Sequence, residues 1–151
     1  MLNGYRQELL YKQIGEASSD AFICSDCDGV ICLWNPGAEA IFGYASQEAV
    51  GQTLDLIMPE KLRLRHWEGY HKVMQAGVTR YEKDLLSTPA LRKDGTSISI
   101  EFSMAMLRDG AGEMVGTAAI VRDVTERWMK EKGLKDQLKH LEAKVAELPR
   151  D

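Results

Sequence analysis

Two histidines lie close together after Pro59, and they are the side chains best suited to hold a cofactor. A neutral imidazole can bind a metal ion, and its charge changes near physiological pH. Apolar residues recur here at steps of three and four, which predicts a helix with Leu62, His66 and Tyr70 on one face. His71 is expected nearer the polar, solvent-exposed side and is the weaker candidate. His66 is the first candidate ligand, with a purely structural histidine as the alternative.

Three cysteines, Cys24, Cys27 and Cys32, form the second group of reactive side chains. Cys24 and Cys27 make a C-x-x-C pair, but no further Cys or His ligands follow at the spacing of a zinc site. An odd number of cysteines without a secretory signal also argues against a disulfide framework. Free or structural thiols are therefore the favoured interpretation, and a metal or redox role is the alternative.

No other motif indicates catalysis or a macromolecular substrate. The chain shows no Ser-His-Asp order, phosphate loop or paired carboxylates, so no enzyme is expected within it. His140 precedes Leu141, Glu142 and Ala143, which does not resemble a kinase phosphoacceptor sequence. A net charge of −4 argues against nucleic acid, and no apolar run is long enough to span a membrane. Without a signal-peptide pattern, a cytoplasmic location is expected.

The elements that must position His66 alternate between helices and strands. Hydrophobic periodicity and turn residues predict helices at 2–14, 38–42, 46–50, 60–76 and 124–148, and strands at 21–25, 30–34, 81–91, 97–106 and 115–123. Asn35 and Ser46 are expected to cap helices, and Pro89 is expected to break its strand. The predicted fold class is α+β: a five-stranded antiparallel sheet with short helices on one side and a pocket facing the His66 helix.

The sequence divides into an N-terminal amphipathic helix at 1–15, a central domain at 16–123 and a C-terminal helix at 124–151. The last helix repeats apolar residues in a heptad pattern at Leu134, Leu138, Leu141, Val145 and Leu148. This seam covers only about two heptads, too short for strong dimerisation alone. We expect a homodimer that uses both terminal helices.

The central region resembles the PAS domains, a family of sensor and dimerisation modules. The resemblance is carried, in order, by residues 20–23, 28–31, 35–44, 50–51, 58–60, 92–96 and 121–127. It implies a PAS fold over about residues 16–127, and a signal passed through the C-terminal helix. Light-sensing flavin domains of this family need a helix cysteine, and residues 60–69 contain none.

The segment at 58–66 is more closely similar to the heme-binding PAS domains of rhizobial oxygen-sensing histidine kinases and of bacterial direct oxygen sensor phosphodiesterases. The 28 positions from His66 to Asp94 fit that subfamily without a gap. The resemblance implies that His66 is the axial ligand of heme b and that a diatomic gas or redox state is sensed. The further cofactor-binding residues it suggests are Lys72 and Arg80 near the propionates, Tyr81 and Leu86 beside the cofactor, and Phe102 and Met104 on the distal side.

The opposite wall of that pocket departs from both groups of relatives. Leu86 stands where the kinases carry a distal arginine, Asp84 stands where the phosphodiesterases place a methionine ligand, and residues 82–85 replace a glycine-rich loop. Met104 could serve as a sixth ligand, although core packing is favoured for it. The alternative function is a heme-free PAS domain that dimerises or binds another small metabolite.

Overall fold

The computed structural model describes residues 6–81 and 84–149. Its centre is a five-stranded sheet in the order β2-β1-β5-β4-β3, in which every pair of neighbours is antiparallel. The strands are β1 (Ala21–Asp26), β2 (Ile31–Trp34), β3 (Leu86–Leu91), β4 (Ser97–Arg108) and β5 (Met114–Asp123). The predicted fold class is therefore confirmed.

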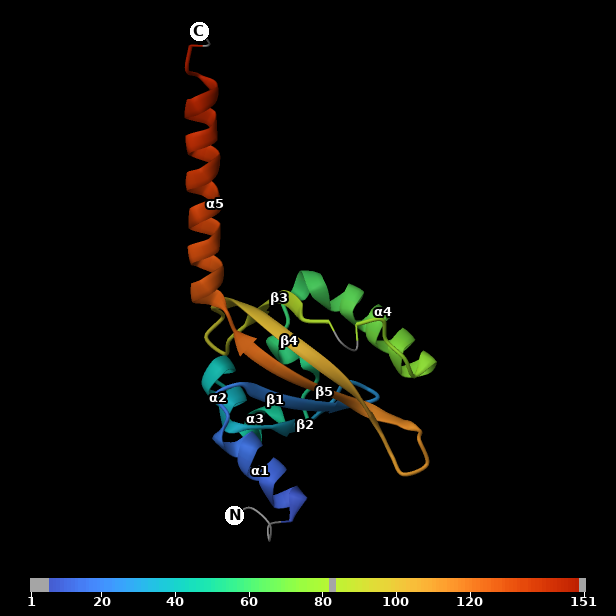
Figure 1. Cartoon of the computed structure of the whole chain (residues 1–151). Helices are drawn as coiled ribbons and strands as arrows, with labels where there is room; N and C mark the ends of the chain where they lie inside the picture. The colour runs from blue at the N-terminus through green and yellow to red at the C-terminus, as the bar shows by residue number, and fades with distance from the viewer. Residues whose placement is uncertain (1–5, 82–83, 150–151) are drawn as a thin grey trace.

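The helices separate into a central group and two terminal ones (Figure 1). Those within the domain are α2 (Pro36–Phe42), α3 (Ser46–Ala49), the 3-10 helix η1 (Leu54–Ile57) and α4 (Glu60–Ala76). The terminal helices are α1 (Gln7–Ala17) and α5 (Thr125–Ala146). The chain thus forms β1 and β2, then places the central helices against the sheet, and then adds the other three strands.

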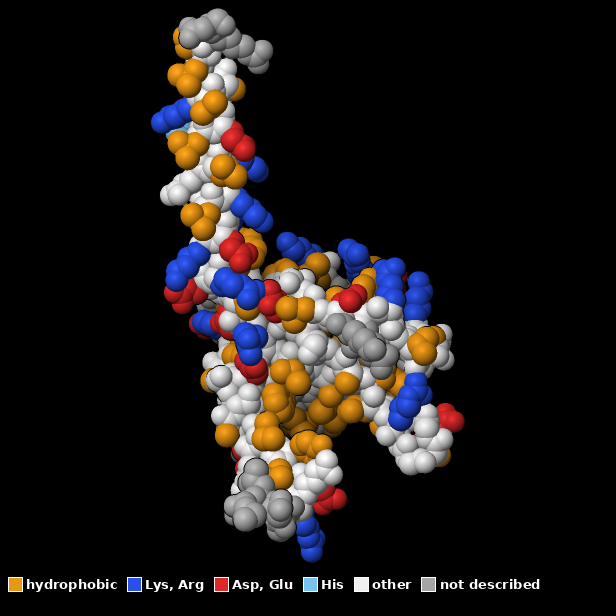
Figure 2. Space-filling view, viewed as in Figure 1, with side chains coloured by type: hydrophobic (Ala, Val, Ile, Leu, Met, Phe, Trp, Pro, Cys, Tyr) orange, Lys and Arg blue, Asp and Glu red, His pale blue; other side chains and the backbone are white. Residues whose placement is uncertain are grey.

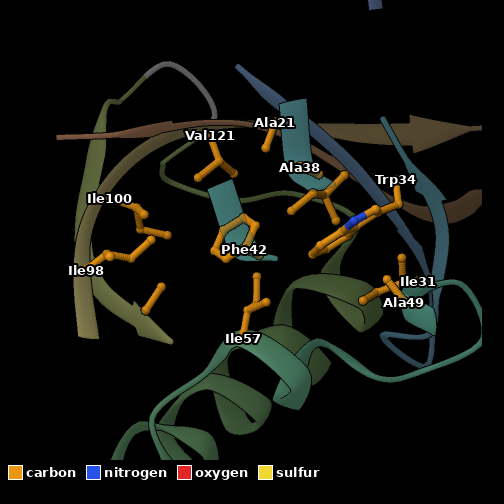
Figure 3. Close-up of a cluster of buried hydrophobic side chains, with 12 residues drawn as sticks. Ala21, Ile31, Trp34, Ala38, Phe42, Ala49, Ile57, Ile98, Ile100 and Val121 are labelled. Carbon is orange, nitrogen blue, oxygen red and sulfur yellow. The ribbon is translucent and has the colours of Figure 1, made fainter. Parts of the chain in front are cut away.

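The hydrophobic core lies between the central helices and the inner face of the sheet. Phe42 is completely buried, and its ring centroid lies 5.4 Å from that of Trp34 on β2. Figure 3 shows Ile57 pointing toward Phe42 from one side and Ile100 and Val121 approaching from the strands. Burying these side chains holds the short helices, which would be unstable alone, against the sheet.

The short helix α2 begins and ends as its sequence predicts. The Asn35 side chain accepts a hydrogen bond from the Ala38 amide at 2.9 Å, and Pro36 occupies the first turn. Gly43 closes the helix at φ +80°, the left-handed conformation that glycine adopts without a steric penalty. The Asn35 amide also donates to the carbonyl groups of Gly15 and Asp20, which ties α1 to the start of the sheet.

The predicted strand at 81–91 is wrong at its start. Tyr81 lies in a turn, where its carbonyl accepts a hydrogen bond from the Asp84 amide at 3.0 Å, and β3 begins only at Leu86. Residues 82–83 lie outside the described part of the chain. Pro89 does not break the strand. It lies inside β3 and pairs with Ser99 of β4. Since β3 is at the sheet edge, a residue without an amide hydrogen is tolerated there.

Two predicted helix boundaries also need correction. The first helix continues through Gly15 to Ala17, and its predicted start at 2–5 lies outside the described residues. A Cβ at Gly15 would lie 3.3 Å from the Phe22 ring, so glycine permits this close packing. At α3 the N-cap is Ala45, not Ser46, and its amide donates to the Glu48 carboxylate at 2.8 Å.

Among the described residues, no helix is both long and apolar enough to cross a membrane. The long helix α5 leaves the domain as a rod, as Figure 1 shows, and none of its residues is buried.

Candidate functional site

His66 lies on α4 and faces the sheet, one turn after Leu62 and one turn before the buried Tyr70. Its ring centroid is 4.9 Å from that of Trp67 and 5.7 Å from that of Tyr70. Its Nδ1 atom is buried and has no hydrogen-bond partner. An unpaired buried polar atom costs about 1–3 kcal/mol, so an occupant that pairs with the imidazole would recover this energy.

His66 borders an almost entirely apolar cavity of about 230 Å³ between α4, η1 and the inner face of the sheet. The cavity is lined by Ile23, Leu54, Ile57, Met58, Leu62, His66, Thr88, Pro89, Ala90, Ile100, Phe102, Ala119 and Val121. Four of the five strands contribute to these walls. Among the residues lining this cavity, only His66 and Thr88 carry a nitrogen or oxygen on the side chain.

The electrostatic environment of His66 favours the neutral imidazole. Burial lowers the pKa of His66, the carboxylate of Asp55 opposes this effect, and the charge of His71 adds to it. A neutral imidazole beside an apolar cavity has a lone pair to offer. It can bind a metal centre or accept a hydrogen bond from a small molecule.

A buried hydrogen-bond network fixes α4 to the sheet one turn beyond His66. The Tyr70 hydroxyl donates to the Asp26 carbonyl at 2.5 Å and lies 3.0 Å from the Ser25 hydroxyl. Ser25 in turn lies 3.0 Å from the Thr117 hydroxyl on β5. These three side chains form one hydrogen-bond network that joins α4, β1 and β5. A movement of α4 must therefore also disturb both strands.

Trp67 makes a second attachment on the adjacent side of α4. Its indole nitrogen donates to Asp55 at 2.8 Å. Its ring lies so close to Gly29 that a Cβ there would be 2.2 Å from the indole. Gly29 also has φ +77°, so both the turn conformation and the contact require glycine.

The structure brings together some of the cofactor-binding residues suggested by the sequence. Phe102 lines the cavity with His66, and Leu86 pairs directly with Phe102 but lies outside the lining. Met104 pairs with Ala119, and it too is absent from the lining. Cofactor binding by these residues remains a prediction.

The basic residues expected near a cofactor edge lie away from the cavity. Lys72 and Arg80 are both exposed, and the Arg80 guanidinium stacks 4.7 Å above the Tyr81 ring. Tyr81 is partly buried outside the cavity lining. Asp84 is exposed, and so is His71, as the helix period predicted.

Sequence reasoning missed most of the cavity wall and the Tyr70 network. Leu54 and Ile57 precede Pro59 in a four-residue 3-10 helix too short to show a period. Ser25 and Thr117 are small polar residues on inward strand positions. The alternation of the strands could have placed them on the inner face, but not opposite Tyr70.

The cavity also connects to the C-terminal helix through β5. Ala119 and Val121 line the cavity, and β5 continues almost directly into α5. At the junction, the Asp123 carboxylate accepts hydrogen bonds from the Thr125 amide at 2.9 Å and from Arg92 at 2.7 Å. These bonds keep the pKa of Asp123 below its usual value, although burial alone would raise it. The start of α5 is therefore fixed to the same strand that walls the cavity.

Known signalling proteins resemble this chain over most of its length. It is 34% identical to the sensor protein FixL of Bradyrhizobium diazoefficiens, a match that covers 71% of this chain and 21% of FixL. It is 30% identical to the oxygen sensor protein DosP of Escherichia coli, over 63% of this chain and 12% of DosP. The chain thus spans about a fifth or less of the length of these relatives.

The fold agrees with this similarity. The crystal structure of a PAS domain from Colwellia psychrerythraea matches 80% of this chain and 99% of its own, with a TM-score of 0.70 and 23% identity. A family model described as the PAS fold matches residues 16–128, which includes the entire sheet, the central helices and the cavity. The chain therefore belongs to the PAS family, the sensory modules of signalling proteins.

Proposed function

We propose that this PAS module binds heme b through His66 and senses a diatomic gas or a redox state. The observation that carries the proposal is the unpaired, buried Nδ1 of His66 beside an apolar cavity. This histidine also occupies the position that resembles the axial ligand of heme-binding PAS domains. The similarity to an oxygen sensor protein supports the same function.

The residues around the cavity fit heme in chemical type. Heme iron takes a neutral histidine as ligand, and burial favours this form of His66. The apolar walls suit a porphyrin face and exclude water from the iron. Lys72 and Arg80 are exposed outside the cavity lining, so they would reach the propionate groups only if α4 and the segment after it moved on heme binding. When bound, heme would supply an iron centre that coordinates a diatomic gas or changes its redox state.

The cavity is smaller than the about 300–1,000 Å³ of typical ligand sites, with a volume of about 230 Å³. Heme binding would therefore require α4 to move outward from the sheet. Such a movement would strain the contacts of Tyr70 and Trp67 with β1 and the β1–β2 turn. The signal would therefore begin with a shift in the position of α4, which depends on whether the cavity is occupied. Because α4 is hydrogen-bonded to the strands, this shift would change the sheet as well.

The signal would leave the module through the flanking helices of a homodimer. The apolar seam residues are 56–66% exposed, four of them on α5 and the last just after its end at Ala146: Leu134, Leu138, Leu141, Val145 and Leu148. Figure 2 shows hydrophobic side chains recurring along this rod among charged ones. On α1, Leu9, Tyr11 and Ile14 are also exposed. A second copy that covers both helices would place the two modules in one signalling unit.

Visible spectroscopy tests heme binding directly. The chain is purified with added hemin, and a Soret band that is retained after gel filtration is expected for the wild-type protein. His66→Ala should abolish the band, whereas His71→Ala, on the exposed side of the same helix, should keep it. A wild-type protein without a band would refute heme binding.

A heme-free module that binds another small ligand is the second candidate, and the small size of the cavity favours it. In that case hemin gives no specific band, while small apolar molecules protect the folded protein against heat. Leu62→Trp, which fills the cavity from α4, should remove this protection. If neither hemin nor apolar molecules bind, dimerisation remains as the role of the module.

A further inference from the structure

Two of the three cysteines lie side by side on the outer face of the sheet. On β1, Cys24 lies between the buried Ile23 and Ser25, so its side chain points to the opposite, outward face. On β2, Cys32 is exposed. The sequence separates these thiols by eight positions, and the β1–β2 hairpin brings them together.

A β-bulge makes this approach possible. Cys24 pairs with Leu33, whereas Ser25 pairs with Ile31, so Cys32 is the extra residue on β2. Ile31 and Trp34 are buried and the two residues between them are exposed, so Cys32 shares the outward face with Leu33. In such a bulge, two residues of one strand oppose a single residue of its neighbour. Cys32 and Leu33 thus both face Cys24.

The spacing suits a covalent link. Cys24 is paired with Leu33, and paired antiparallel residues have Cα atoms about 4.5–5.5 Å apart. Cys32 is the bulge residue next to Leu33 and faces the same Cys24, and disulfides join residues whose Cα atoms are about 4.4–6.8 Å apart. The two thiols also interact electrostatically: burial raises the pKa of Cys24, and the charge of a Cys32 thiolate raises it further.

Cys27 is placed differently, although it forms the C-x-x-C pair with Cys24. Three extended residues separate their Cα atoms by about 10 Å, too far for a disulfide. The Cys27 thiol donates a hydrogen bond to the Met114 carbonyl at 3.3 Å, at the start of β5. Cys27 is therefore a natural control for the other two.

We propose that Cys24 and Cys32 form a dithiol site that hydroperoxides oxidise to an intramolecular disulfide. The exposed Cys32 sulfur attacks one peroxide oxygen and breaks the O–O bond, which gives a sulfenic acid and, with hydrogen peroxide, water. Cys24 then attacks the Cys32 sulfur, forming the S–S bond and releasing the sulfenic oxygen as a second water. The two thiols together lose two electrons and two protons, and the peroxide is reduced to two waters.

The disulfide would join β1 to β2 at the bulge. Because β1 also carries Ser25, which contacts Tyr70, oxidation would stiffen the strand that holds α4. The site is on the face of the sheet opposite the cavity, so it does not depend on heme or any other cavity ligand.

The test uses the full chain, prepared without added hemin and treated with hydrogen peroxide. Cleavage before Asp20, Asp26 and Asp28 places the three cysteines on three different peptides. The proposal predicts one linked pair, residues 20–25 joined to the peptide that begins at residue 28, which dithiothreitol separates. The intact protein should lose two hydrogens in mass without forming a dimer on a non-reducing gel.

Three variants sharpen the result. Cys27→Ser should form the same link as the wild type, whereas Cys24→Ser and Cys32→Ser should each prevent it. The circular dichroism spectrum of each variant verifies that the sheet is intact. A link that includes Cys27, a disulfide between two chains, or stable sulfinic acid at Cys32 in place of the link would overturn the proposal.

Discussion

The helices α4 and α5 differ in where their apolar residues find partners. On α4, Leu62 and His66 face the cavity and Tyr70 is buried against the sheet. On α5, by contrast, no residue is buried, and its leucines remain more than half exposed. Both helices carry apolar residues at helical spacing, and the structure shows which of these residues are covered within the domain.

This difference separates two roles within one small module. The apolar face of α4 packs inside the domain, so α4 shapes the cavity, and under the proposed function it would respond to an occupant. The apolar positions of α5 are exposed among the described residues, and the proposed function predicts that a second copy covers them. Substitutions on α4 should therefore affect folding, and those on α5 should affect association.

The largest expected effect on stability is that of Trp67→Ala. The change removes the contact with Gly29 and the hydrogen bond to Asp55, and should lower the free energy of unfolding by about 3 kcal/mol. The matched control is Trp128→Ala on α5, where the side chain is 46% exposed and the loss should be below about 1 kcal/mol. Urea denaturation measures both. Equal losses would contradict the contrast between the helices.

Tyr70→Phe should have an intermediate effect. It removes one hydroxyl and leaves the Ser25 hydroxyl and the Asp26 carbonyl with fewer partners, at a cost of about 1–2 kcal/mol. Tyr11→Phe, on the exposed face of α1, removes a hydroxyl that water can replace, and stability should hardly change. Hydrogen exchange in β1 and β5 should rise only in the Tyr70 variant. Unchanged exchange would argue against coupling of α4 to these strands.

A smaller, pH-dependent effect is expected from His66. Because burial lowers its pKa in the folded state, the unfolded chain takes up a proton at a higher pH, near about 6.5. Stability should therefore fall as the pH drops below that value, and level off once the folded form is also protonated. His66→Leu should remove this part of the loss of stability at low pH, as urea denaturation at pH 8 and pH 5 can show. If both proteins lost the same stability between pH 8 and pH 5, His66 would not be the cause.

The smallest effect on folding is expected from the seam of α5. Leu138→Lys with Leu141→Lys changes two residues that are exposed by more than half, so the free energy of unfolding of the monomer should change by about 0.5 kcal/mol or less. The same pair should lower the fraction of dimer measured by light scattering, because lysine cannot fill a heptad core. Lys135→Ala with Lys139→Ala is the control beside the seam. An unchanged mass would refute the predicted interface.

Local sequence signals predicted the elements well where a single pattern dominates. The Asn35 cap, the Gly43 and Gly77 helix ends and the alternation in β4 all depend on contacts between near neighbours. The strand predicted at 81–91 begins too early, because Glu82, Lys83 and Asp84 are poor strand formers and pairing with β4 begins only at Leu86. Strand limits are set by the partner strand, which a single sequence does not specify.

The cysteines also show that contacts between strands are not specified by the local sequence. The C-x-x-C spacing drew attention to Cys24 and Cys27, but an extended strand holds these thiols apart. The neighbour of Cys24 is Cys32, because a bulge shifts the register by one residue. A bulge depends on how two strands pair, and no local sequence motif predicts it.

The sequence by itself determined the α+β order, the PAS resemblance and the inward direction of His66, because helix period and turn chemistry act over a few residues. The tertiary structure alone decided that His66 meets an apolar cavity with an unpaired Nδ1, and that Tyr70 joins Ser25 and Thr117. These contacts join residues far apart in the chain. Their geometry follows from the strand order and from the packing of α4 against the sheet, which no local pattern encodes.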